Sequence, residues 1–258
     1  MHLMRVRAGG VGWSWVGSLA ALVVATSGLE AQAGRGEGFL FREPLSTVTF
    51  HGGFALPRAG SDLFDDVTKD LTLDRSNFAA ASFGMDLAVA VTPRWDVVFG
   101  FGPSSSRTPS EFRDWVDNND LPIEQVTSYS RSPFLLSARY HLTEKGRMVG
   151  SFAWIPTRVV PFVSAGAGLV RYRFEQDGDF IDEETLNVFT DRLRTDGWSW
   201  VGQVGGGAHL SLSPRVMLTG EARYLLGGVD AGRASGDFVG YRLDLSGLTT
   251  LVGLSFRL

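Results

Sequence analysis

The chain contains no cysteine, and this absence removes several classes of protein. Without thiols there is no disulfide framework, no thiolate nucleophile and no cysteine-ligated metal centre. After residue 29 no apolar run is long enough for a membrane-spanning helix. A basic excess is also lacking, since the formal net charge is −4, so nucleic acid is not an expected partner. There is no glycine-rich phosphate loop or histidine cluster, so neither a cofactor nor a metal ion is expected.

The N-terminal segment has the organisation of a secretory signal peptide. Arg5 and Arg7 precede a charge-free apolar stretch over Val11–Leu29, and the small-residue site Ala31-Gln32-Ala33 follows. The length of the apolar stretch leaves an uncleaved signal anchor as the alternative. The chain is therefore expected to be exported, with residues 1–33 as signal peptide, 34–45 as a periplasmic leader and 46–258 as the folded domain.

Beyond the leader, apolar and polar residues alternate with a period of two, the pattern of β-strands. In the first run Phe50 and Phe54 share one face, while Thr49 and His51 share the other. Similar runs follow to the end of the chain, and together they predict eight strands joined in four hairpins. The runs lie at 47–56, 81–91, 95–102, 134–142, 162–174, 198–212, 216–226 and 248–258.

The connections between these runs alternate in length. Those at 92–94 and 213–215 are very short, the one at 143–157 is intermediate, and all three carry basic residues. The other four are long and acidic, at 57–77, 103–124, 175–197 and 227–240. Short turns at one end and long loops at the other are typical of a transmembrane barrel. In the second long loop, the capping-box pattern Thr108-Pro109-Ser110-Glu111 predicts a short helix that packs Phe112, Trp115 and Val116 over the barrel mouth.

Alternation alone does not say which face meets water. A soluble lipocalin-like barrel turns its apolar face inward around a ligand, whereas a membrane barrel turns that face toward lipid. Charges of both signs near mid-strand on the less apolar face favour the membrane barrel, because they could pair within a narrow polar interior. The predicted lumen charge network consists of Asp86, Arg139, Arg171, Glu221 and Arg223.

The positions of the aromatic residues and of the last strand favour the same choice. Aromatic side chains concentrate toward strand ends, where an interfacial girdle would place them. Alternation continues to Leu258, and a last strand that closes on the first would satisfy the backbone pairing that hydrocarbon requires. The sequence thus predicts an all-β fold, an eight-stranded antiparallel up-and-down transmembrane β-barrel. Its predicted girdle is Trp95, Tyr140, Tyr172, Trp198, Trp200, Tyr224 and Phe256.

The export signal, eight strands, glycine and aromatic alternation and terminal strand resemble the small outer-membrane barrels of Gram-negative bacteria, the OmpA, OmpX and OmpW-like group. The resemblance covers Ser46–Leu258 and implies a location in the cell outer membrane. It also implies that Phe256 and Leu258 form an assembly signal for the barrel-assembly machinery, although this chain ends in leucine with its nearest aromatic at Phe256. Outer-membrane lipid and lipopolysaccharide are the other implied partners, and a monomer is favoured.

Three functions remain open for such a barrel. The first is a structural or surface-interaction role through the long loops. The second is a narrow, porin-like channel similar to the OmpW-type barrels, although an eight-stranded lumen is about wide enough for side chains to fill, which favours a plug. The third is lipid A deacylation, because His209, Ser211 and Glu221 are similar to the His-x-Ser and downstream Glu of lipid A deacylases. That pair falls on the lumen face beside a short turn, so no catalytic residue is assigned and an enzyme is not expected.

Overall fold

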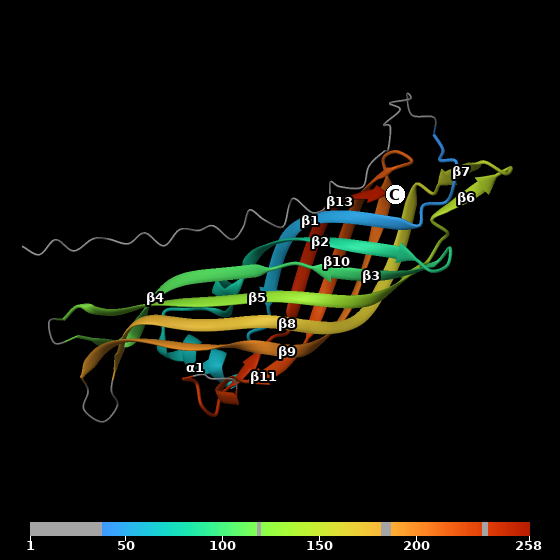
Figure 1. Cartoon of the computed structure of the whole chain (residues 1–258). Helices are drawn as coiled ribbons and strands as arrows, with labels where there is room; N and C mark the ends of the chain where they lie inside the picture. Colours follow the sequence, from blue (N-terminus) through green and yellow to red (C-terminus); the bar gives the residue numbers. More distant parts are fainter. Residues whose placement is uncertain (1–37, 118–119, 182–186, 234–236) are drawn as a thin grey trace, which may run out of the picture. The chain divides into compact units, whose positions relative to one another are not determined.

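The computed structural model describes residues 38–117, 120–181, 187–233 and 237–258, which form an antiparallel up-and-down barrel (Figure 1). The predicted signal peptide, its cleavage site and the first residues of the leader lie outside this range. None of the helices in the described part of the chain is long and apolar enough to cross a membrane.

Eight barrel strands close into a ring, as the sequence predicts. β3 and β4 together make the third of them, because both pair with β5 in one continuous register across Gly102-Pro103. The ring closes where β1 pairs with β13, from Thr47 opposite Arg257 to Pro57 opposite Gly247. The barrel elements are β1 (Ser46–Pro57), β2 (Ala80–Ala90), β3 (Trp95–Phe101), β4 (Ser104–Val116), β5 (Pro122–His141), β8 (Val159–Ile181), β9 (Val188–Ser211), β10 (Val216–Leu226) and β13 (Gly247–Arg257).

Small elements lie at the two ends of the barrel. The end with the short turns carries a hairpin of β6 (Gly146–Val149) and β7 (Ala153–Pro156). The end with the long connections carries α1 (Asp62–Asp70), the 3-10 turns η1 (Arg75–Phe78) and η2 (Ala231–Arg233), and the paired β11 (Gly228–Asp230) and β12 (Arg242–Asp244).

Two of the predicted long loops are instead extended strands. Residues 104–116 pair with residues 122–131 as β4 and β5, and residues 175–181 pair with residues 188–194 as a continuation of β8 and β9. In Figure 1 these four strands project well beyond the rest of the barrel, beside α1. The prediction of a helix from Thr108-Pro109-Ser110-Glu111 is therefore wrong. The backbone of these residues pairs with β5 instead, and the Ser106 and Ser110 hydroxyls donate hydrogen bonds inward to carbonyls of β5. The helix of the long-loop end is α1, in the preceding connection.

The barrel exterior is apolar over a broad belt. The outward-facing side chains of Phe83, Leu136 and Leu254 are 69%, 59% and 46% exposed, whereas Arg139 inside the barrel is 2% exposed. A contiguous exposed apolar surface of this kind marks contact with lipid or protein, and on a closed barrel it is the lipid-facing surface. The structure thus confirms the predicted fold class, and it excludes a soluble cup with an apolar interior along these strands.

Beyond this belt the polarity of the extended strands reverses. Along β8, Val163 and Leu169 face outward in the belt, but further on Tyr172 and Phe174 face inward while Arg171 and Arg173 face outward. The strand keeps its period of two throughout; only the surroundings change, from lipid outside to water outside. The inward side chains become the core of a folded region outside the membrane.

That core joins the extended strands to α1. Phe64 of α1 lies edge-on to Tyr129 and Phe174, with ring centroids 5.4 and 5.6 Å apart. Such edge-to-face contacts between buried rings stabilise packing beyond area burial alone. We call this region the platform: α1, η1, β4, the parts of β5, β8 and β9 beyond the apolar belt, and residues 228–233 and 237–246 with β11 and β12. Its buried core comprises Leu63, Phe64, Val67, Leu71, Leu73, Phe78, Tyr129, Tyr172, Phe174, Phe238, Leu243 and Leu245.

Candidate functional site

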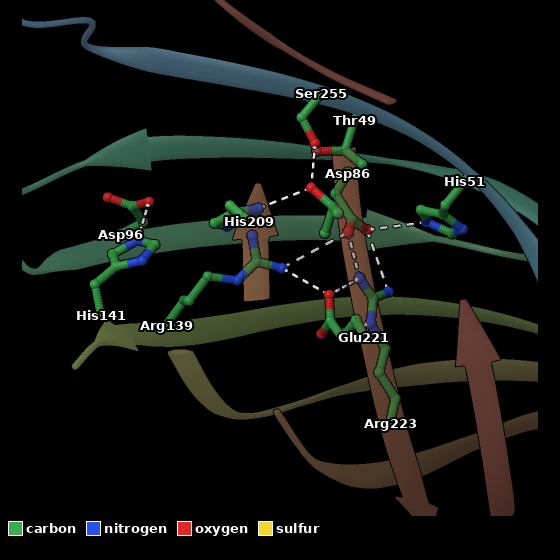
Figure 2. Close-up of polar contacts among 11 residues, drawn as sticks. Thr49, His51, Asp86, Asp96, Arg139, His141, His209, Glu221, Arg223 and Ser255 are labelled. Carbon is green, nitrogen blue, oxygen red and sulfur yellow. Dashed lines mark hydrogen bonds and ion pairs between the residues drawn. The ribbon is translucent and has the colours of Figure 1, made fainter. Parts of the chain in front are cut away.

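Four charged side chains meet inside the barrel. Asp86 comes from β2, Arg139 from β5, and Glu221 and Arg223 from β10 (Figure 2). The Arg223 guanidinium donates to both carboxylates: to Asp86 through both terminal nitrogens, and to Glu221 Oε1 from Nε at 2.8 Å. Arg139 Nη2 donates to Glu221 Oε2 at 3.0 Å. The sequence-predicted residues are thus brought together across the lumen, with the exception of Arg171.

The cluster is buried and its charges balance. Two arginines face two carboxylates, and the side chains of Arg139, Asp86 and Glu221 are each 3% exposed or less. Pairing of opposite charges offsets part of the desolvation cost of buried ions, while Arg139 Nε has no hydrogen-bond partner among the described residues. Phe162 lies under Arg139, with the guanidinium carbon 4.3 Å from the ring centroid, which adds a cation–π contact. Gly100 lies directly against the cluster, since a Cβ added at this position would be only 2.7 Å from Asp86 Oδ1.

The placement of Arg171 in this network is wrong, as is that of Tyr172 in the girdle. The Arg171 side chain is 50% exposed on the barrel exterior, 3.5 Å from Asp196, and Tyr172 is 1% exposed in the platform core. The small residues Ser164-Ala165-Gly166-Ala167-Gly168 precede them and carry little polarity. They therefore conceal the point at which the apolar face changes sides.

Further polar groups extend the lumen filling toward the short-turn end. A hydroxyl chain runs from Thr49 through Ser255 to Thr219, which bonds His209 Nδ1 at 2.7 Å (Figure 2). Asp96 on β3 bonds both His141 Nε2 at 2.8 Å and Lys145 Nζ at 2.7 Å. Sequence reasoning missed Asp96 as a lumen group, although its position between outward-facing Trp95 and Val97 was a usable signal.

Both mouths of the barrel are covered. At the long-loop end the platform core lies over the lumen, and Arg131 donates to the Leu245 carbonyl at 2.8 Å. At the short-turn end Trp154 of β7 is buried against Arg257, which lies 5.3 Å from its ring. Trp154 also exchanges two backbone hydrogen bonds with Leu40 of the leader, at 2.7 and 2.8 Å.

The spaces left inside are small. The lumen cavity lined by His51, Gln203 and Arg223 has a volume of about 40 Å³. Next to the ion cluster a cavity lined by Asp86 and Ser164 has a volume of about 10 Å³. Volumes of this size hold at most a few water molecules. The interior is therefore a filled polar core interrupted by water-sized gaps.

The deacylase-like residues do not assemble into a triad. His209 bonds Thr219, Ser211 Oγ donates to the Thr157 carbonyl at 2.8 Å and accepts from Arg257, and Glu221 belongs to the ion cluster. Nucleophilic catalysis requires a hydrogen bond between nucleophile and base, which His209 and Ser211 lack. Within the described residues, no group of three or more His, Asp or Glu side chains could hold a metal ion.

The remaining predicted girdle residues lie on the barrel exterior. Trp95 and Tyr140 pack together near the short-turn end, with ring centroids 4.9 Å apart. Phe256 packs near Phe50 at 6.5 Å. Toward the platform, Trp198 and Trp200 are 51% and 75% exposed, and Tyr224 is half-buried on the outward face of β10. The role of Phe256 and Leu258 as an assembly signal stays a prediction.

A closed antiparallel ring with an apolar exterior and a filled polar interior defines an outer-membrane-type barrel. No protein-family model matches the sequence, and no curated protein is significantly similar to it. The fold is similar to that of the outer membrane protein OprG from Pseudomonas aeruginosa, at 12% identity over 85% of this chain and 99% of that chain, with a TM-score of 0.49.

Two further solved structures are similar in the same way. Neisserial surface protein A is 12% identical over 83% of this chain and 97% of that chain, with a TM-score of 0.43. The N-terminal β-barrel domain of Pseudomonas aeruginosa OprF is 13% identical over 84% of this chain and all of that chain, with a TM-score of 0.38. These chains are small outer-membrane barrels of the group that the sequence resembles. At such identities the likeness concerns the fold alone.

Substitution of Glu221 by Gln should test the energetic role of the ion cluster. The change keeps the shape but leaves Arg139 and Arg223 to share one carboxylate, so the free energy of unfolding should fall by about 3–5 kcal/mol. Denaturant unfolding from lipid vesicles, followed by tryptophan fluorescence, measures this. The control is Asp177→Asn, which removes one of the two carboxylate partners of Arg192, a side chain that is 62% exposed; it should cost at most about 1 kcal/mol. Equal losses in the two variants would contradict the role of the cluster.

Proposed function

We propose that this chain is an integral outer-membrane protein in which a closed barrel anchors a rigid platform for contacts outside the cell. The observation that carries the proposal is the combination of a blocked lumen with four strands that extend past the apolar belt into a second, folded core. A conduit would need an open axis. A barrel that only fills the membrane would not need the platform.

The construction of the platform supports a role in surface interaction. Its strands are paired through Ile181 opposite Val188, and its core contains α1 and several interlocked aromatic rings. A surface held in one conformation loses little conformational entropy when it binds a partner, unlike a flexible loop. Its long strands also raise that surface away from the membrane.

The main alternative is a narrow channel for small solutes. It would require the Asp86–Arg223 and Arg139–Glu221 contacts to part, together with movement of Trp154 at one mouth and α1 at the other. Separating a buried ion pair without new partners is strongly unfavourable. The closed anchor is therefore the better supported function.

Planar bilayer recordings distinguish the two functions. The purified protein should give no discrete conductance steps, because the lumen is occupied by ion pairs and both mouths are covered. A general porin recorded in the same bilayers serves as the positive control. Reproducible steps from the purified chain, absent from mock-purified samples, would contradict the closed anchor and support the channel.

Single-cysteine labelling tests the location and orientation of the barrel, since the chain has no cysteine of its own. Asp191→Cys places a thiol on the exposed outer part of β9, and Arg215→Cys places one in an exposed short turn. On intact Gram-negative cells a membrane-impermeant maleimide should label the first variant, and it should label the second only after the outer membrane is permeabilised. Labelling of Arg215→Cys alone on intact cells would reverse the proposed orientation.

A further inference from the structure

The outward-facing side chains of the extended strands change from apolar to polar within two residues along each strand. The last apolar row across them consists of Phe101, Phe134, Leu169 and Trp200, which are register partners. The next outward row contains Ser132, Arg171 and Trp198, and the row after it contains Ser105, Ser130, Arg173 and Asp196. Arginines and hydroxyls thus follow directly on the lipid-facing surface.

The arginines of these rows are available to a ligand. Arg171 lies over the Trp198 ring at 5.8 Å and only 3.5 Å from Asp196, but its side chain is 50% exposed. Asp196 is shared with Arg194, which it bonds at 2.9 Å. Arg173 is exposed and has no ion-pair partner among the described residues. The serines beside both arginines are partly exposed, so their hydroxyls can donate outward.

On the outward face of β4, β5, β8 and β9, net positive charge is confined to the rows next to the apolar belt. Going outward from the apolar row, the first three rows hold Arg107, Arg171, Arg173 and Arg194 against Asp196 and Glu175. Farther out, the same face carries Glu111, Glu124, Asp177 and Asp179 with Arg192. A ligand attracted here must therefore present its negative charge at the edge of the lipid-facing belt.

We propose that Arg171, Arg173, Ser130 and Ser132 form a binding site for the phosphorylated headgroup of a lipid in the surrounding leaflet. Guanidinium groups bind phosphate in bidentate fashion, and tryptophans such as Trp198 and Trp200 settle at headgroup depth. The acyl chains would lie along Phe134 and Leu169, directly adjoining the site. A soluble phosphate compound would make no use of this apolar continuation, which favours a lipid. The site rests on the membrane location proposed above.

Native mass spectrometry of the folded protein in detergent, titrated with diphosphoryl lipid A, tests the site. Arg171→Gln/Arg173→Gln should weaken binding roughly fivefold or more, since one basic residue near an anionic membrane surface contributes about that factor. The matched control is Arg75→Gln/Arg192→Gln, which removes the same charge from exposed platform positions outside the three positive rows and should change binding less than twofold. Lipid A without phosphates should bind both variants and the parent protein equally weakly.

The outcomes separate this site from the proposed function. Equal binding by the parent protein and Arg171→Gln/Arg173→Gln would overturn the site, as would equal loss in the control pair, which would indicate unspecific attraction. Arg171→Lys/Arg173→Lys, which keeps the charge but loses the bidentate geometry of guanidinium, provides a second variant and should bind lipid A more weakly than the parent protein but more tightly than the glutamine pair. Folding of each variant is checked by heat-modifiable gel mobility. Failure of the site would leave the cysteine-labelling result, and hence the anchor and its orientation, unaffected.

Discussion

Completion of every backbone hydrogen bond within the protein is the constraint on which this structure depends. Hydrocarbon offers no partner for an exposed N–H or C=O, so the sheet must close, and it does so along the full length of β1 against β13. In a closed sheet the number of strands sets the width of the lumen. With eight strands the space inside is about what side chains fill. The polar, blocked interior is thus a consequence of the ring.

The filling of that interior shows how charge is accommodated in a small barrel. Asp86, Arg139, Glu221 and Arg223 satisfy one another from three strands, and hydroxyls and histidines continue the network toward the short-turn end. The Arg139–Glu221 and Arg223–Asp86 contacts link strands that are not neighbours in the sheet, so they hold the ring in shape across the lumen, whereas the hydroxyl and histidine contacts join neighbouring strands. Where the lipid ends, an apolar core with α1 takes over the same task.

The sequence predicted the fold well because alternation, strand number and turn lengths are local properties. It placed Asp86, Arg139, Glu221 and Arg223 on one face, and the structure brings them together. Two features were beyond it. Strand length was underestimated, since serine-rich residues 104–116 carry no apolar face until their pairing with β5 is known.

The change of polarity along β8 was the second such feature. Alternation has the same period whether the inner or the outer face is apolar, so Arg171 and Tyr172 were each assigned to the wrong side. Only the position of the lipid boundary decides the side, and no local pattern encodes it. The outward arginines that follow from this correction form the proposed lipid site.

The central claim is that one outward face of β5 passes from lipid into water while the strand continues unbroken. Nitroxide labels at single cysteines along that face, at Ser128, Ser132, Leu136 and Ala138, test it directly by collision with oxygen and with an aqueous nickel complex. In lipid vesicles, labels at positions 136 and 138 should favour oxygen and the label at 128 should favour nickel, with position 132 in between. Nickel accessibility at 136 and 138 equal to that at 128 would contradict the account.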